Sequence, residues 1–233
     1  MRDETIQHQR QQVLLDKKWQ KFLRRMWLFR HIPFVSVVLA AGSMALGNVH
    51  PESDFDVIIG AGSGRIFTTR FFAAVLFSLF VWRRTKLSHK ETATDKICLN
   101  HFVTPAAYRL SSPHNEYWKK LYFSLVPVYG APEKIRQFWA SNADWLGEIP
   151  RVGDDLRHQH KKPSKIKLVI ECVLSGKKGD WLEAMFKKIQ ISRIERGLKS
   201  QLGHQPRIIY NDNELEFHPD TKRIDDYLKG GLR

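Results

Sequence analysis

The sequence predicts an α+β fold, in which a mixed sheet flanked by helices is followed by a mainly helical C-terminal region. Three predicted strands lie in the first half of the chain, at 34–40, 54–59 and 96–103, and the first of them is rich in β-branched residues. From residue 105 onward, apolar residues instead recur at helical spacing. The 233 residues are 42% apolar, which is enough to bury a substantial core.

The first half is expected to alternate helices and strands. Residues 5–30 predict an amphipathic helix that Pro33 ends. The strand at 34–40 breaks at Ala41-Gly42-Ser43, and 44–46 suits a short helical turn. A loop at 48–53 then leads to the strand at 54–59. The remaining elements are a glycine-rich turn, a buried helix, a loop and a strand, at 60–64, 65–82, 83–95 and 96–103.

The second half is expected to be helical with one hairpin. A segment with Gly, Pro and clustered charges, 147–163, suits a linker, so we expect a catalytic domain at 1–147 and a mainly helical region at 148–233. Asn211-Asp212-Asn213 predicts the turn of a hairpin between 207–210 and 214–217. The predicted helices are 116–126, 132–145, 164–174, 180–198 and 221–228.

Composition limits the partners and the compartment. The net charge of +14 favours anionic partners, among them nucleic acid and nucleotide phosphates, although a basic solvated surface explains it too. Cys98 and Cys172 lie far apart, which favours two buried, reduced thiols. The polar start lacks a signal-peptide pattern, and the most apolar stretch, 71–82, is too short to span a bilayer. We therefore expect a cytoplasmic protein without a membrane partner.

Asp54 and Asp56 are the first candidate site residues. Side chains two apart in a strand point to the same face, so both carboxylates project together. Two such charges repel each other, and a divalent cation removes that repulsion. Mg²⁺ favours carboxylate oxygens and takes phosphate oxygens as its remaining ligands. The pair therefore predicts an Mg²⁺ site, with Mn²⁺ as the alternative ion.

Gly42 and Ser43 are the second pair of candidates. A glycine at the end of a strand lets the backbone approach a phosphate closely, and Ser43 adds a hydroxyl donor. The helical turn that follows offers free N–H groups to an anion. The sequence thus predicts that a triphosphate cradle lies beside the metal-binding carboxylates.

Residues 37–59 (VVLAAGSMALGNVHPESDFDVII) resemble the signature of the DNA polymerase β-like nucleotidyltransferase superfamily. That signature has Gly-Ser after a strand, a spacer of about ten residues, and two acids flanking one residue in a second strand. The segment 50–56 (HPESDFD) also resembles small bacterial members. The resemblance implies that Asp54 and Asp56 bind metal ions and that Gly42 and Ser43 hold the β- and γ-phosphates of a nucleoside triphosphate such as ATP.

The third carboxylate of that superfamily has no clear counterpart here. The resemblance places it on a later strand, and the predicted strand 96–103 has no Asp or Glu in its middle. Asp95 precedes that strand, and Asn100 lies within it. Asp95 could serve, Asn100 could act as a neutral ligand, or the third acid could be missing.

Other features have competing interpretations. The segment 57–65 (VIIGAGSGR) lacks the last glycine of a dinucleotide-binding fingerprint. His158 and His160 lie in a basic linker, which favours a solvated loop over a metal site. The basic face of the first helix could contact nucleic-acid phosphates, together with four later residues, or could simply be solvated. Those four residues are Arg83, Arg84, Lys86 and Lys90.

The expected function is transfer of a nucleoside monophosphate from a nucleoside triphosphate to an acceptor, by two-metal Mg²⁺ chemistry. RNA, protein and small molecules all stay open as acceptors. The alternative is a catalytically inactive protein that binds nucleotide or RNA on the same scaffold, which the uncertain third carboxylate motivates.

Overall fold

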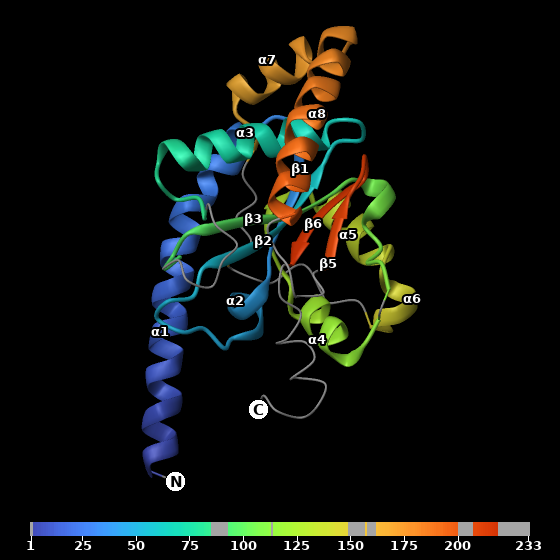
Figure 1. Ribbon diagram of the computed structural model, residues 1–233. Helices are drawn as coiled ribbons and strands as arrows, with labels where there is room; N and C mark the ends of the chain where they lie inside the picture. Colours follow the sequence, from blue (N-terminus) through green and yellow to red (C-terminus); the bar gives the residue numbers. More distant parts are fainter. Residues whose placement is uncertain are drawn as a thin grey trace.

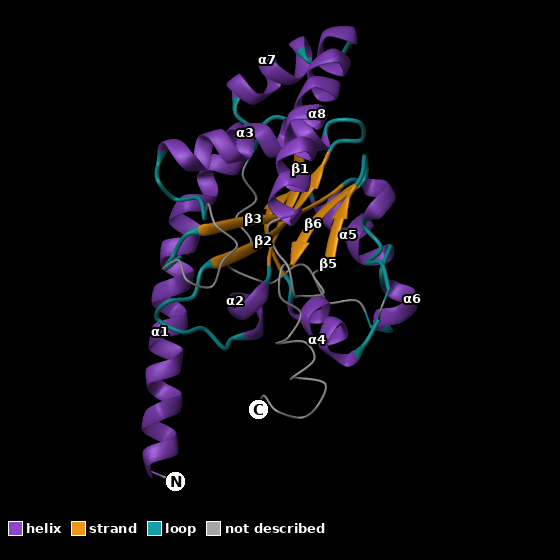
Figure 2. Cartoon of the chain, viewed as in Figure 1, coloured by secondary structure: helices purple, strands orange, loops and turns teal. Residues whose placement is uncertain are grey.

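A mixed six-stranded sheet organises the chain, in the strand order β4-β1-β2-β3-β6-β5 (Figures 1 and 2). The computed structural model describes residues 2–84, 93–112, 114–148, 157, 162–199 and 207–218. Strands β2 and β3 are parallel, and the other neighbouring pairs are antiparallel. The strands are β1 (Val35–Ala40), β2 (Phe55–Ala61), β3 (Ile97–Val103), β4 (Val126–Gly130), β5 (Arg207–Tyr210) and β6 (Glu214–His218).

Helices flank the sheet, so the expected α+β class with a mixed sheet is confirmed (Figure 2). The α-helices are α1 (Arg2–Met26), α2 (Gly42–Leu46), α3 (Ile66–Leu79), α4 (Glu116–Ser124), α5 (Pro132–Ala140), α6 (Ala143–Leu146), α7 (Lys165–Val173) and α8 (Lys177–Lys199). Two 3₁₀ segments join them, η1 (Trp27–His31) and η2 (Pro105–Ala107).

Two hydrophobic clusters cover opposite faces of the sheet. One cluster joins side chains of α1, α3 and α8 to Val57 and Ile59 of β2. The other joins side chains of α4, α5 and α6 to Ile58. Because strand side chains alternate, Asp56 projects toward the same face as Ile58. The face covered by α4, α5 and α6 therefore carries the candidate site.

Strand β4 is a correction to the sequence analysis. The predicted helix 116–126 ends at Ser124, and Val126 begins a strand that pairs with β1. Pro127 cannot donate a backbone hydrogen bond, which hid this strand in the sequence. Its position at the edge of the sheet explains why proline is tolerated there.

Two expectations about burial are also corrected. The helix at 65–82 was expected to be buried, yet α3 leaves Val75 and Leu79 exposed, because it packs against β3, α8 and η1 on one side and meets solvent on the other. Cys172 was expected to be buried, and it is exposed on α7, whereas Cys98 is buried. Both thiols are free.

The C-terminal elements join the same sheet and core. The predicted hairpin is confirmed, since β5 pairs with β6, and β6 then pairs with β3. Helix α8 holds α3 through Glu183, whose carboxylate accepts the backbone N–H groups of Phe67 and Thr68 at 2.8 and 2.7 Å. Such a carboxylate satisfies the free donors at a helix start.

Some expectations remain predictions. The division between 1–147 and 148–233 is one of them. The predicted helix 221–228, both linker histidines, Lys86 and Lys90 lie outside the described residues. Among the helices that the structure describes, none is long and apolar enough to cross a membrane.

Candidate metal site

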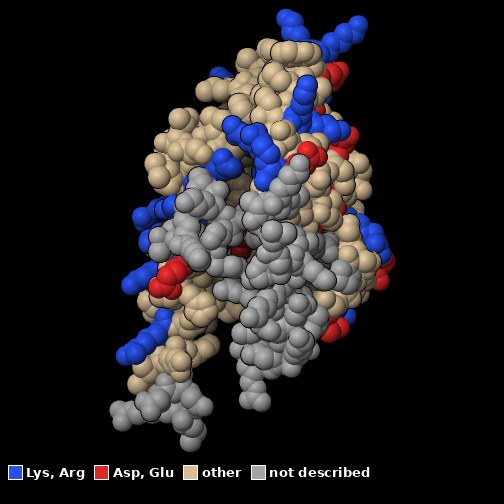
Figure 3. Space-filling model, viewed as in Figure 1, with Lys and Arg blue, Asp and Glu red and all other residues tan. Residues whose placement is uncertain are grey.

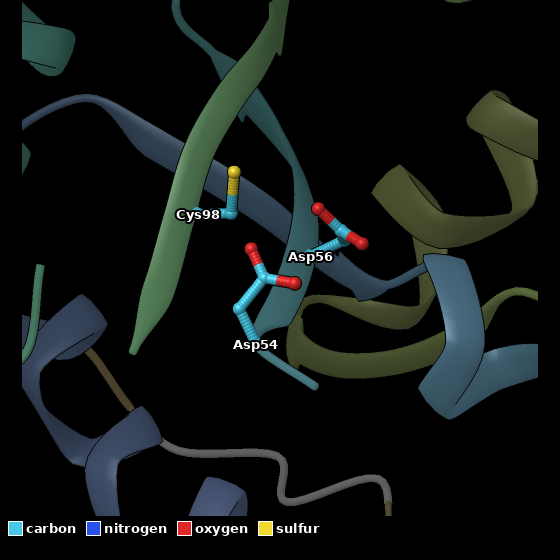
Figure 4. A group of neighbouring side chains, drawn as sticks. All are labelled: Asp54, Asp56 and Cys98. Atoms are coloured by element: carbon cyan, nitrogen blue, oxygen red, sulfur yellow. The ribbon is translucent and has the colours of Figure 1, made fainter. Parts of the chain in front are cut away.

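Asp54 and Asp56 lie together at the start of β2, as their spacing predicted. They form a group with Cys98 of β3, in which one ligand atom from each residue lies within 4.8 Å of the others (Figure 4). The register explains the third member, because Asp56 pairs directly with Cys98 across the parallel strands. Both aspartates are half-buried, and Cys98 is buried.

Helix α1 fixes the loop that leads into Asp54. The buried ammonium of Lys18 donates to the carbonyls of Pro51 and Ser53 at 2.7 and 2.8 Å. Nearer the start of the same helix, the Gln11 amide donates to the carbonyl of Val49 at 2.9 Å. These bonds satisfy backbone carbonyls of the irregular segment between Gly42 and Asp54. They therefore fix the conformation of that segment.

Gly42 lies directly against Asp56. Its φ is +59°, and a Cβ atom at this position would stand 2.2 Å from Oδ2 of Asp56. Ala41 N–H donates to the Asp56 carbonyl at 3.0 Å, which ties the end of β1 to β2. Only glycine meets both the positive φ and the close approach. The expected proximity of the Gly-Ser turn and the acidic pair is therefore present.

Ser43 lies in the first turn of α2 and is half-buried. Its carbonyl accepts the N–H of Asn48 at 3.1 Å and that of Gly47, which closes this short helix. Gly47 has a φ of +75°, the left-handed conformation common at helix ends. The backbone of Ser43 thus helps to shape the turn. The phosphate-binding role of its hydroxyl stays a prediction.

The Cys98 thiol stays protonated beside the two carboxylates. Burial raises its pKa well above the usual value, and the negative charges of Asp56 and Asp54 raise it further. The thiol also hydrogen-bonds the Asp56 side chain. A protonated thiol is a poor ligand for Mg²⁺, which prefers oxygen. Asp54 and Asp56 are therefore the pair in this group that suits such an ion.

Arg84 is a site residue that sequence reasoning assigned to a different role. Its guanidinium Nη1 lies 2.7 Å from Oδ2 of Asp54, with both side chains 17% exposed. Burial lowers the pKa of Arg84, but the charges of Asp54 and Asp56 outweigh that effect, and the net shift is upward. The backbone N–H of Arg84 donates to the Ile97 carbonyl, which sets its position beside β3.

Asp95 binds α1. Its carboxylate pairs with the ammonium groups of Lys18 and Lys21 at 2.8 and 2.7 Å, and its carbonyl accepts a hydrogen bond from Arg25. Asn100, the other candidate, lies buried in β3 two residues beyond Cys98, where the ladder with β2 is irregular. The described group around the aspartates thus contains Cys98. It contains neither Asp95 nor Asn100, the two candidates expected from the sequence.

These contacts also revise the predicted basic face of the first helix. Lys21 and Arg25 belong to that face, and both contact Asp95. No sequence signal predicted the roles of Arg84 and Cys98, because Cys98 reaches the site through the register between β2 and β3, and Arg84 through its backbone bond to Ile97.

The two carboxylates fit a divalent cation chemically. Like charges so close repel, and the arginine at Asp54 offsets only part of that repulsion. Comparisons with protein-family models, curated proteins and solved structures found no match.

Proposed function

We propose that this chain is an Mg²⁺-dependent nucleotidyltransferase of the DNA polymerase β-like superfamily. One observation supports it above the others: Gly42 packs so closely on Asp56 that even a methyl group would collide with the carboxylate. A phosphate held at this turn would lie next to a cation held by the aspartates. Substrate phosphates commonly complete the coordination of Mg²⁺ in such sites.

Each residue has a role in this proposal. Asp54 and Asp56 would hold Mg²⁺, which supplies charge stabilisation at the α-phosphate when bound. Gly42 and Ser43 would position the β- and γ-phosphates. Arg84 would leave Asp54 when a cation takes that carboxylate, and its guanidinium would then be available to a triphosphate oxygen.

The acceptor would bring a hydroxyl or similar group to the α-phosphate. In the transfer, the acceptor hydroxyl gives its proton to water, its oxygen bonds to that phosphorus, the bond from phosphorus to the bridging oxygen breaks, and pyrophosphate leaves. RNA ends, protein side chains and small molecules are the acceptor classes to compare. A cytoplasmic setting, expected from the cysteine usage, belongs to the same proposal.

A second candidate is a nucleotide- or RNA-binding protein without turnover. Cys98 favours it, because this position opposite Asp56 carries a protonated thiol where a third carboxylate would complete a two-metal site. The same turn and aspartates would still bind a triphosphate with Mg²⁺. Turnover therefore separates the two candidates.

Transfer of label from α-labelled ATP, CTP, GTP and UTP tests the first candidate. The full chain is incubated with each triphosphate, Mg²⁺ and acceptors of the three classes. We expect labelled product and pyrophosphate with the wild type, and a loss of at least about 100-fold on Asp54→Asn with Asp56→Asn, since both metal ligands weaken. Asp16→Asn removes an exposed carboxylate of α1 and serves as the matched control.

The outcomes separate the proposals. Transfer that persists in the folded double variant would reject the assigned site. Triphosphate binding that needs Mg²⁺ and the aspartates, but yields no pyrophosphate with any acceptor, would support the second candidate.

A further inference from the structure

A second group of metal-binding side chains lies on β3 and β6, apart from the aspartates. His101, Glu214 and Glu216 each offer one ligand atom within 4.8 Å of the others. They are 3%, 4% and 0% exposed, respectively. In the antiparallel pair of β3 and β6, His101 lies opposite Glu216, and Val103 lies opposite Glu214.

The spacing of these atoms suits a small divalent cation. His101 Nε2 lies 3.5 Å from Oε1 of Glu214. Ligands at about 2.0–2.2 Å from a tetrahedral zinc ion stand roughly 3.4 Å apart, so this pair is close to ligating geometry. One imidazole nitrogen with two carboxylate oxygens is a ligand set that zinc accepts, with manganese as the second choice.

Two of the three side chains are buried carboxylates, which are groups that a bound cation stabilises. Two carboxylates inside the protein cost free energy unless a cation or strong hydrogen bonds compensate them. Ser111 supplies one hydrogen bond, from its hydroxyl to Oε2 of Glu214 at 3.3 Å. A divalent ion would neutralise both carboxylates at once and leave the imidazole as a neutral ligand.

We propose that His101, Glu214 and Glu216 bind one Zn²⁺ ion, which fastens the β5–β6 hairpin to β3. The ligands come from both strands of the β3–β6 pair, so an ion would link them directly (Figure 1). Because all three side chains are almost fully buried, the ion would lie enclosed between the two strands and would hold them together. The inference is independent of the nucleotidyltransferase proposal.

Contacts beside the group show what the ion would reinforce. Thr104 follows β3, and its N–H and hydroxyl donate to the carbonyl and side chain of Asn213 at 2.8 and 2.9 Å. Leu215 and Phe217 project to the other face of β6 and join the main core. The hairpin is thus held at its turn and on one face, and the ion would hold the opposite face.

Zinc binding to the full chain tests this inference. The test uses a background protein in which the candidate site at Asp54 and Asp56 has been removed by substitution. Protein carrying Asp54→Asn and Asp56→Asn is stripped with a chelator, and Zn²⁺ is titrated by calorimetry while Co²⁺ serves as an absorbing probe. We expect one Zn²⁺ per chain and a Co²⁺ spectrum typical of low coordination number. Adding Glu216→Gln should weaken the affinity by about 100-fold or more, and His101→Gln should do the same.

A stability measurement guards against misfolding. Zn²⁺ should raise the melting temperature of the background protein and leave that of the Glu216→Gln protein unchanged. A folded background protein that binds no Zn²⁺, or Glu216→Gln and His101→Gln proteins that bind it as tightly as the background, would overturn the proposal.

Discussion

At the residue scale, one glycine links the two halves of the candidate site. Gly42 has a positive φ and contacts Asp56, whereas Gly47 has a similar φ, and a Cβ atom there would meet only Leu15, at 3.9 Å. A side chain therefore costs the same backbone strain at both positions, about 1–2 kcal/mol for a left-handed L-residue. Only at Gly42 does it also displace a carboxylate.

Gly42→Ala and Gly47→Ala should therefore separate stability from function. We expect both proteins to unfold at lower urea than the wild type, and Gly42→Ala to be the less stable of the two because its Cβ also displaces the Asp56 carboxylate. Only Gly42→Ala should lose Mg²⁺-dependent label transfer, by on the order of 100-fold, because a shift of the Asp56 carboxylate by about an ångström costs that much. Equal transfer rates in the two variants would show that the contact between Gly42 and Asp56 has no catalytic role.

Sequence reasoning predicted this residue pair because the information is local. Period-two alternation places Asp54 and Asp56 on one face, and a glycine after a strand predicts a tight turn. Cys98 and Arg84 were assigned no place in the site because their positions depend on long-range register. A one-residue slip between β2 and β3 would turn Cys98 to the other face.

At the element scale, α1 braces the loop that carries Asp54. Its buried Lys18 binds both that loop and Asp95, and Lys21 adds a second charge to the Asp95 carboxylate. Burial raises the pKa of Asp95, but the hydrogen bonds and charges of Lys18 and Lys21 outweigh it and lower the pKa overall. The ionised carboxylate thus stabilises the docked helix.

Asp95→Asn should reveal that contribution as a function of pH. Asp95 has a φ of +61°, and asparagine also tolerates this left-handed conformation. The substitution therefore removes the charge without adding backbone strain. At pH 7 we expect the free energy of unfolding to fall by on the order of 2 kcal/mol, since Lys18 loses its partner but keeps two carbonyls. Asp16→Asn, on the exposed side of α1, should change it by less than about 0.5 kcal/mol.

The pH window follows from the direction of the shift. A lowered pKa in the folded protein means that the stabilisation is complete above the unfolded value of about 3.9 and is lost as pH falls through the folded value. The difference between wild type and Asp95→Asn in urea unfolding should stay constant from about pH 7 to 5 and shrink below about pH 4. If the difference in unfolding free energy already shrinks between about pH 7 and 5, the assignment of this stabilisation to the Asp95 carboxylate would be contradicted.

Elements were predictable where their pattern is strong. The hairpin around Asn211-Asp212-Asn213 and the strand at 54–59 have clear turn and β-branched signals, and both are confirmed. Strand β4 was missed because it is short and contains Pro127, and only its pairing with β1 makes it a strand.

At the scale of the whole molecule, positive charge is spread over several elements. Figure 3 shows Lys and Arg side chains along α1 and over α7 and α8 on the face it presents. Part of the charge is used internally, as at Lys18 and Arg84, each of which pairs with a carboxylate. The net charge of +14 agrees with anionic partners in general, and the function proposed above selects a triphosphate with its cation from that class.

The fold class was predictable from the distribution of strand and helix patterns, but the order of the strands was not. That order brings β6, from the end of the described chain, beside β3, and so places His101 against Glu216. Residues so far apart in the chain meet only through this topology, and local pattern carries no information about such pairs.

The most direct test of the central claim is Mg²⁺-dependent triphosphate binding. The four α,β-methylene nucleoside triphosphates resist transfer, and calorimetry measures their affinity with and without Mg²⁺. We predict that at least one of them binds the wild type and the Asp16→Asn protein only when Mg²⁺ is present. Its affinity for the protein with Asp54→Asn and Asp56→Asn should be weaker by about 10-fold or more. Binding that is equally tight without Mg²⁺, or in the folded double variant, would contradict the claim that these aspartates and the Gly42 turn form one metal-triphosphate site.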